Sequence, residues 1–197
     1  MGPIENPDDV IDLANAFFAP RALLAAARTG VFAALEGCPL EAAAVAAATS
    51  CDARATGLLL DALAALGLLE KRPGAPAASY ALSPLARECL VPGSPRDLTD
   101  YLKLNADTFE SWSRFEDALR SGSPVEVSSR AAKEGAPERH RDFILAMRST
   151  ARGTARIVAE RLDLAALLGR VPAHILDLGG GPGTFALELA RRYGCDA

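Results

Sequence analysis

The sequence has few of the residues from which disulfide frameworks and metal sites are built. Its 197 residues include 4 cysteines and 2 histidines, and no two cysteines have the Cys-x-x-Cys spacing of a zinc site. We therefore expect Cys38, Cys51, Cys89 and Cys195 to be thiols in a reducing cytosol, and we expect no metal site.

An excess of positive charge is also absent. The chain has 21 Lys and Arg against 25 Asp and Glu, which gives a formal net charge of −4. Surfaces that bind nucleic acids need clustered cations opposite the phosphates. The composition therefore disfavours a nucleic-acid partner.

Neither a leader peptide nor a membrane span is predicted. Residues 1–10 contain Glu5, Asp8 and Asp9 in place of the basic start of a signal peptide. The longest nearly uncharged run that we identify, residues 37–50, is shorter than the roughly 20 apolar residues of a membrane-spanning helix. We therefore predict a cytoplasmic protein with no membrane partner.

What the sequence does contain is helical periodicity, beginning at its N-terminal end. Apolar residues recur at helical spacing over residues 7–35. Pro20 is expected to divide this stretch, so that residues 21–29 form a second helix ended by Gly30. Phe17 and Phe18 are adjacent and cannot share one helix face, so we expect one of them to face outward or to contact a partner.

Two further helices are predicted next. An Ala-rich helix is expected over residues 39–48, and a second one over residues 53–66 with Asp52 as its N-cap. The second helix should present one broad apolar face, made of Leu58, Leu59, Ala62, Leu63 and Leu66.

A β-hairpin is predicted to follow that helix. Residues 68–72 and 79–82 have strand character and are separated by a Pro- and Gly-containing turn. Two helices followed by a hairpin are typical of a winged helix. A DNA-binding winged helix needs cations on its recognition helix, but here Arg54 is opposed by Asp61, so we disfavour a transcription regulator.

A linker candidate at residues 91–95 leads into two long helical patterns, over residues 97–120 and 138–168. Gly169 is expected to end the second pattern. Three cations of the second pattern recur at i, i+4 and i+8: Arg148, Arg152 and Arg156. We expect this stripe to be solvated, with contact to a carboxylate as the alternative.

The periodicity then changes from helical to that of a strand. Residues 173–178 are a short apolar run, a glycine loop follows at residues 179–183, and residues 185–193 are again helical. Strand, glycine turn and helix begin a βαβ unit, in which a ligand can approach the bare backbone and an anion the helix N-terminus. A tight turn capped by Asp177 is the alternative, and Pro182 disfavours a dinucleotide fingerprint.

Residues 175–184, together with the winged-helix region, resemble motif I and the N-terminal domain of S-adenosylmethionine-dependent methyltransferases. More narrowly, the chain is similar to the small-molecule O-methyltransferases of plant phenylpropanoid and of bacterial polyketide or phenazine pathways. The resemblance implies a mostly α chain: a winged-helix dimerisation domain over residues 1–95, a helical connector over 96–170, and the first β-α unit of a Rossmann-like α/β domain over 171–197.

The same resemblance implies S-adenosyl-L-methionine as the cofactor. The residues expected to hold it are Asp177, Gly179, Gly180, Gly181, Gly183 and Met147. Phe143 would border the acceptor substrate, although an aromatic and a Met one helical turn apart are also typical of core packing. Phe17 or Phe18 would close the pocket of a dimer partner.

The implied activity is methyl transfer to a hydroxyl of a small aromatic or polyketide-like metabolite by a homodimer. No catalytic residue is assigned, because the family's histidine base lies well past motif I and neither His140 nor His174 matches it. We therefore expect the N-terminal portion of a truncated methyltransferase, with weak or absent cofactor binding and no activity of its own. A non-catalytic dimerisation partner of a complete methyltransferase is the alternative.

Overall fold

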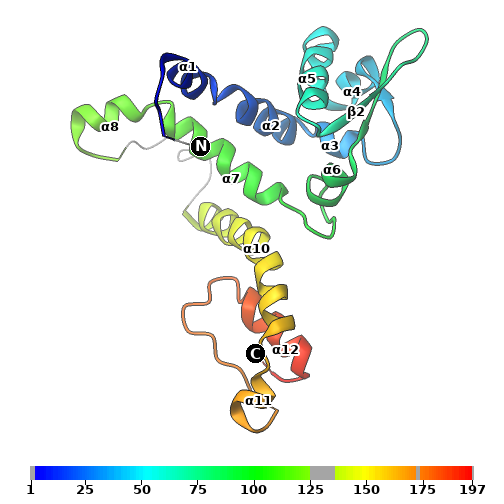
Figure 1. The fold of residues 1–197 in the computed structure, drawn as a ribbon. Helices are drawn as coiled ribbons and strands as arrows, with labels where there is room; N and C mark the ends of the chain where they lie inside the picture. Colours follow the sequence, from blue (N-terminus) through cyan, green and yellow to red (C-terminus); the bar gives the residue numbers. More distant parts are fainter. Residues whose placement is uncertain (1–2, 125–135, 172–173, 197) are drawn as a thin grey trace. The chain divides into compact units, whose positions relative to one another are not determined.

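The computed structural model describes residues 3–124, 136–171 and 174–196. Internal contacts divide the chain into two compact units, Met1–Ser94 and Pro95–Ala197 (Figure 1). The predicted mostly helical fold is confirmed, since helices dominate both units and the described residues contain one small sheet. The division into three domains stays a prediction.

The first unit opens with helices α1 (Pro7–Asn15) and α2 (Phe18–Thr29). Asn6 caps α1 by accepting hydrogen bonds from the N–H groups of Asp8 and Asp9. The predicted break at Pro20 is wrong, because Pro20 lies in the first turn of α2, where its missing N–H has no intrahelical acceptor. Gly30 ends α2 as predicted, with a φ of 82°.

Together, α1 and α2 expose an apolar surface. Within the described part of the chain, one stretch, Pro7–Thr29, has the length and composition of a membrane-crossing helix, with 23 residues and a mean hydropathy of 1.4. The prediction that the chain lacks such a run is wrong on those two criteria. Only 11% of the most apolar 18 residues of this stretch are buried. Its exposed apolar side chains are Val10, Ile11, Leu13, Phe17 and Phe18.

The remaining elements of the first unit are α3 (Val31–Ala34), β1 (Leu40–Glu41), α4 (Ala42–Thr49), α5 (Ala53–Ala65), β2 (Leu69–Arg72), β3 (Ser79–Leu82) and α6 (Pro84–Cys89). The predicted hairpin β2–β3 is present, and its two strands join β1 in an antiparallel sheet of order β1-β3-β2. Strand β1 was not predicted. Leu40 and Glu41 pair with β3, so α4 begins later than the expected helix.

The core of the first unit lies between these helices and the sheet. Its largest fully buried side chains are Val31, Phe32, Leu35, Val45, Leu60, Leu63 and Leu82. Asp52 caps α5 as predicted, by accepting the Ala55 N–H at 2.8 Å. The predicted apolar face of α5 is partly wrong, because Leu58 and Leu66 are exposed. The stripe that is buried follows i, i+4, i+7 spacing and comprises Thr56, Leu60 and Leu63.

The second unit contains α7 (Thr99–Trp112), α8 (Phe115–Ser121), α10 (Ala136–Arg161), α11 (Leu164–Leu168) and α12 (Thr184–Tyr193). Helix α10 packs against both α7 and α12. Both long helical patterns predicted for this region are interrupted once. The second breaks where Asp163 caps α11 by accepting the Ala166 N–H at 3.0 Å, and Gly169 ends α11 as predicted.

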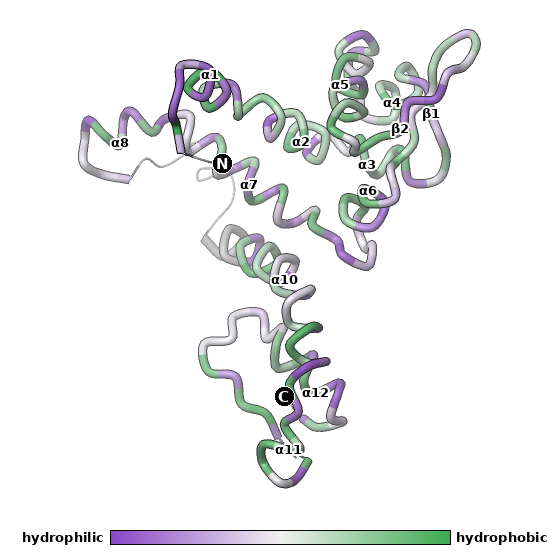
Figure 2. The backbone as a smooth tube through the Cα atoms, in the orientation of Figure 1, coloured by the Kyte–Doolittle hydropathy of each residue, from purple (hydrophilic) through white to green (hydrophobic). Residues whose placement is uncertain are grey.

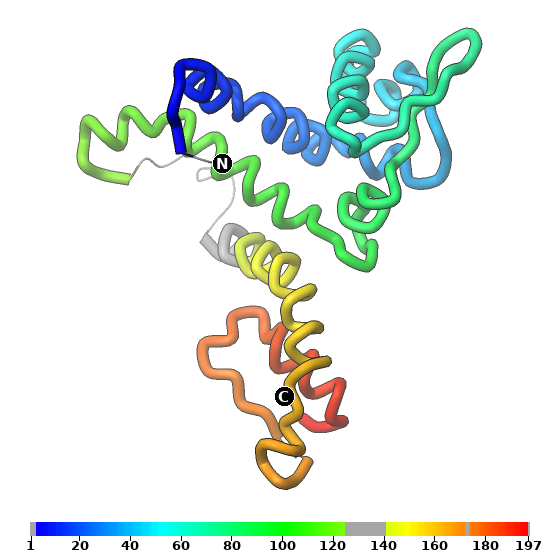
Figure 3. Tube along the Cα trace, viewed as in Figure 1, coloured from blue at the N-terminus to red at the C-terminus, as the bar shows by residue number. Residues whose placement is uncertain are grey.

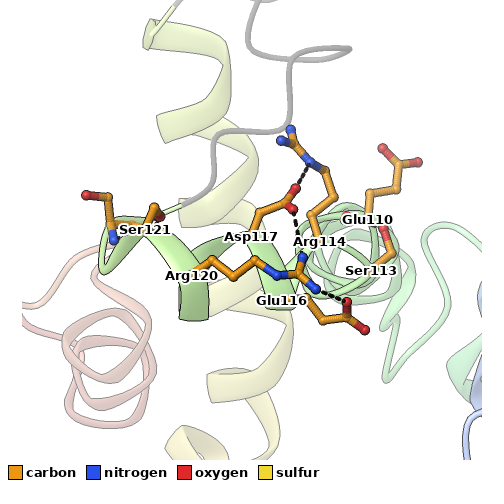
Figure 4. Close-up of polar contacts among 8 residues, drawn as sticks. Glu110, Ser113, Arg114, Glu116, Asp117, Arg120 and Ser121 are labelled. Atoms are coloured by element: carbon orange, nitrogen blue, oxygen red, sulfur yellow. Dashed lines mark hydrogen bonds and ion pairs between the residues drawn. The ribbon is translucent and has the colours of Figure 1, made fainter.

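Helix α8 is stabilised by a local group of ion pairs (Figure 4). Asp117 accepts from Arg114 Nε at 3.1 Å and lies 3.8 Å from Arg120 Nη1, while Arg120 also pairs with Glu116 at 3.2 Å. All four side chains are exposed, so each pair contributes at most about 1 kcal/mol. The group stabilises one short helix and marks no binding site.

Candidate functional site

The predicted strand before the glycine loop is not formed as an element. Within residues 174–178, only His174 is bridged, in an isolated parallel pairing with Asp196. The Ile175 N–H donates to the Asp196 carbonyl oxygen at 2.9 Å. Ala173 lies outside the described residues. The bridge is parallel, and α12 lies between its two members in the sequence. A parallel pair joined through a helix is the arrangement of a βαβ unit.

Exposure of this segment explains why the strand prediction is wrong. Leu176 is 82% exposed and Leu178 is 85% exposed. A parallel strand needs hydrogen-bonded neighbours along its edges and apolar cover on its faces. The described residues supply one bridge and leave Leu176 and Leu178 uncovered, so no strand forms here. Figure 2 shows hydrophobic colour in this loop and in α11.

The glycine loop itself has the backbone that the sequence indicates. Gly179, Gly181 and Gly183 have φ values of 75°, 55° and 65°, in the left-handed region that disfavours side chains. The Gly183 N–H donates to the Gly180 carbonyl at 2.9 Å and closes a four-residue turn around Pro182. The alternating glycines are therefore required by the path of the backbone.

Asp177 and Gly180 lie against each other. A Cβ atom built on Gly180 would collide with the carboxylate of Asp177. The absence of a side chain at Gly180 therefore lets the carboxylate fold over the loop. These two predicted site residues are brought together by the backbone alone.

The loop ends at the N-terminus of α12, which no side chain in the described part of the molecule caps. The N–H groups of its first turn have no intrahelical acceptors and carry the positive end of the helix dipole. Thr184 is 6% exposed, and its Oγ1 is buried without a hydrogen-bond partner. Sequence reasoning missed Thr184, although a hydroxyl residue directly after the last glycine was the available signal.

Helix α12 is held firmly against the end of α10 (Figure 3). The Tyr193 hydroxyl donates to the Leu162 carbonyl at 2.6 Å and accepts the Leu164 N–H at 2.8 Å. Arg192 donates to the Glu160 carbonyl at 2.8 Å. These bonds satisfy backbone groups at the junction of α10 and α11, and they fix the helix that carries the glycine loop.

Of the other predicted site residues, Phe18, Phe143 and Met147 lie on helices and Phe17 lies in the turn before α2. Phe143 is exposed and Met147 is half-buried, one turn apart on α10. Phe17 and Phe18 belong to the first unit, and both are exposed. Their ring centroids are 4.2 Å apart, and the expectation that one of them faces outward is confirmed, since both are exposed.

By sequence, neither histidine matches the catalytic base of the family that the chain resembles. His174 is exposed beside Asp196, and the side chain of His140 lies outside the described residues. In the described ranges, no group of three or more His, Cys, Asp or Glu side chains is arranged to bind a metal ion. The four cysteines are free thiols.

Comparison with known proteins places these features in a family. Residues 11–92 match the O-methyltransferase dimerisation domain. Acetylserotonin O-methyltransferase of Mus musculus molossinus is 36% identical over 197 residues, which cover 93% of this chain and 49% of that protein. The tetracenomycin polyketide synthesis 8-O-methyl transferase TcmO of Streptomyces glaucescens is 34% identical, over 96% of this chain and 55% of that protein.

A solved structure agrees with these relatives. The crystal structure of human N-acetylserotonin methyltransferase in complex with SAM superposes with a TM-score of 0.77 and 31% identity, covering 99% of this chain and 59% of that one. The chain thus spans about half the length of the curated relatives it matches. The matched domain and these relatives together show that the chain belongs to the O-methyltransferase family and contains the family's dimerisation domain.

Proposed function

We propose that this chain forms the dimerisation domain, the helical connector and the first cofactor-binding loop of an S-adenosylmethionine-dependent O-methyltransferase. The observation that carries the proposal is the glycine loop, with the Asp177 carboxylate folded over Gly180 at the uncapped N-terminus of α12. The named relatives are an acetylserotonin O-methyltransferase and an 8-O-methyl transferase of tetracenomycin polyketide synthesis. A small aromatic or polyketide-like acceptor follows for this protein.

The loop residues suit the amino-acid part of the cofactor. An ammonium group is matched by the Asp177 carboxylate, and a carboxylate by the free N–H groups at the start of α12. Gly179, Gly181 and Gly183 leave the backbone open to a ligand, and Thr184 has an unused hydroxyl. When bound, S-adenosylmethionine supplies a methyl group on a positively charged sulfur.

The contribution of this chain to methyl transfer is positioning. An in-line displacement depends mainly on how the attacking oxygen and the methyl carbon are aligned. We propose that Met147 borders the cofactor and Phe143 the acceptor, both on α10, the helix against which α12 packs. No residue of this chain is proposed as the base that takes the hydroxyl proton.

The exposed surface of α1 and α2 suits a second copy of the chain. Its apolar side chains belong to a stretch that overlaps the matched dimerisation domain. Burying these side chains in a dimer would stabilise the dimer by about 25 cal/mol for each Å² of apolar surface removed from water. We therefore propose a cytoplasmic homodimer in which this stretch crosses no membrane and Phe17 or Phe18 closes the partner's acceptor pocket.

Amide NMR with S-adenosylhomocysteine tests the cofactor site. We expect only weak binding, with a dissociation constant of roughly 1 mM (about −4 kcal/mol), because Leu176 and Leu178 are uncovered. Amide shifts should be confined to residues 177–187 and to the neighbours of Met147 on α10, and Gly181→Ala should remove them. Shifts that leave the loop unaffected, or that persist in the variant, would contradict the assignment.

A second candidate function follows from the same exposed segment. Leu176 and Leu178 lack cover in this chain, and a complete methyltransferase subunit offers both a dimer surface and a sheet. The chain would then act as a non-catalytic dimerisation partner. Co-expression with a full-length relative distinguishes the two, since a stable heterodimer supports the second function and exclusive homodimers support the first.

A further inference from the structure

The second unit contains a cavity of about 590 Å³ that the methyl-transfer proposal does not use. It is lined by Pro95, Arg96 and Leu98 and by residues of α10 and α12. Four of its lining residues are arginines, namely Arg96, Arg152, Arg156 and Arg191, and one is an acid, Glu188. The cavity is therefore cationic in a chain whose formal net charge is −4.

The arginines differ in how they are paired. Arg156 bonds to Glu160 at 3.1 Å and Arg191 to Glu188 at 2.7 Å. The guanidinium of Arg152 has no hydrogen bond or ion pair with any residue in the described ranges. It lies one turn before Arg156 on α10, where two like charges repel each other. An anion in the cavity would neutralise this repulsion and use the open guanidinium.

Neither Phe143 nor Met147, the two α10 residues proposed for methyl transfer, lines the cavity. Arg152 follows Phe143 by nine positions, which at about 3.6 residues per turn places it on the opposite face of α10. Met147 shares the Phe143 face. Thr150 and Ile157, which also line the cavity, lie on the Phe143 face, so the cavity reaches around α10 from that face to Arg152.

We propose that this cavity is a binding site for a small molecule that carries several oxyanion groups, either phosphates or carboxylates. A planar guanidinium donates two parallel hydrogen bonds to either group. Ser149 lines the same cavity and its hydroxyl can add a donor, whereas the Thr150 hydroxyl already donates to the Met147 carbonyl at 3.0 Å. A volume of about 590 Å³ falls within the range of small-molecule sites. The proposal does not depend on the methyltransferase assignment.

Calorimetry at constant ionic strength tests the site with two probes, pyrophosphate and citrate. We expect saturable binding of at least one probe, with one site per chain, and the preferred probe identifies phosphate or carboxylate as the ligand chemistry. Arg152→Gln should weaken binding at least about tenfold, because one guanidinium contact is lost. Arg152→Lys should weaken binding by less, because lysine keeps the positive charge but cannot donate two parallel hydrogen bonds.

Arg148→Gln is the matched control. Arg148 belongs to the same stripe of cations on α10 but does not line the cavity, so its loss should change the affinity less than about twofold. Circular dichroism and the thermal midpoint establish that each variant is folded. The site assignment is wrong if neither probe saturates, or if Arg148→Gln weakens binding as much as Arg152→Gln does.

Discussion

The Tyr80 hydroxyl donates a hydrogen bond to Asp61 Oδ1 at 2.7 Å, and the Lys71 ammonium donates to the same oxygen at 2.6 Å. Asp61 lies on α5, Lys71 on β2 and Tyr80 on β3. One carboxylate oxygen therefore joins the helix to both strands of the hairpin. This contact fixes the hairpin relative to the core of the dimerisation domain.

Tyr80→Phe should lower the free energy of unfolding by about 1 kcal/mol, the usual net contribution of one hydrogen bond. The ring stays buried, so packing is preserved and the loss reports the hydroxyl alone. Urea denaturation followed by circular dichroism measures it. Tyr101→Phe is the control, because the described residues provide no hydrogen-bond partner for its hydroxyl, and an equal loss there would contradict the role given to Tyr80.

The same cluster predicts an acid dependence of stability. The hydrogen bond from Lys71, and then that from Tyr80, lowers the pKa of Asp61 below its ordinary value. The folded state therefore binds the Asp61 proton less tightly than the unfolded state does. This stabilisation is present above about pH 4 and is lost as the pH falls through the lowered pKa.

Asp61→Asn should accordingly flatten the fall in stability between about pH 4 and pH 2. Urea midpoints of the wild type and the variant across that range measure the effect. Asp12→Asn removes a carboxylate that has no hydrogen bond or ion pair within the described ranges, so its acid profile should follow the wild type. If the Asp61→Asn profile follows the wild type too, the cluster does not act as described.

Gly180→Ala should reduce the response of the loop to S-adenosylhomocysteine. The added methyl group collides with the Asp177 carboxylate, which must move away from the loop. We expect the amide shifts of residues 177–187 to fall at least about tenfold at a fixed ligand concentration, which corresponds to about 1.4 kcal/mol of lost affinity. Unchanged shifts would show that the position of Asp177 is irrelevant to binding.

Gly153→Ala should stabilise the protein. Gly153 lies inside α10, and a Cβ atom added there meets no heavy atom within 4 Å. Alanine lowers the entropy of the unfolded chain and favours the helix, so the free energy of unfolding should rise by about 0.5–1 kcal/mol. Thermal denaturation measures the gain, and a loss of stability would imply a close neighbour at this position.

Tyr193→Phe should loosen α12 from α10. The substitution removes the bonds to the Leu162 carbonyl and the Leu164 N–H, each of which normally contributes about 0.5–1.5 kcal/mol. We expect amide hydrogens of α12 to exchange about tenfold faster or more, while those of α5 are unchanged. Equal acceleration in both helices would indicate global destabilisation instead of local release.

Many local features of the fold were predictable from neighbouring residues. Asp52 precedes a helix it can cap, Gly30 and Gly169 end helices in the left-handed conformation, and the hairpin strands flank a turn. The glycine loop was predictable for the same reason, because its φ values are accessible to glycine and costly for other residues. Each of these depends on interactions within a few residues along the chain.

Contacts between distant residues explain the predictions that are wrong. Strand β1 exists because Leu40 and Glu41 meet β3, and no local pattern announces that pairing. The buried stripe of α5 was set by which of its side chains face α4, α2 and β2. Residues 174–178 have the composition of a strand, but in the described ranges their one bridge partner is Asp196, so they do not form a strand.

The sequence by itself determined several helix caps and ends, which backbone positions need glycine, and to which family the chain belongs. Only the tertiary structure decided that Asp177 folds over Gly180, that Tyr193 holds α12 on α10, and that Arg152 lines a cavity. The physical reason is range. Caps and φ preferences act between near neighbours, whereas hydrogen bonds between helices and the shape of a cavity depend on packing that brings distant residues together.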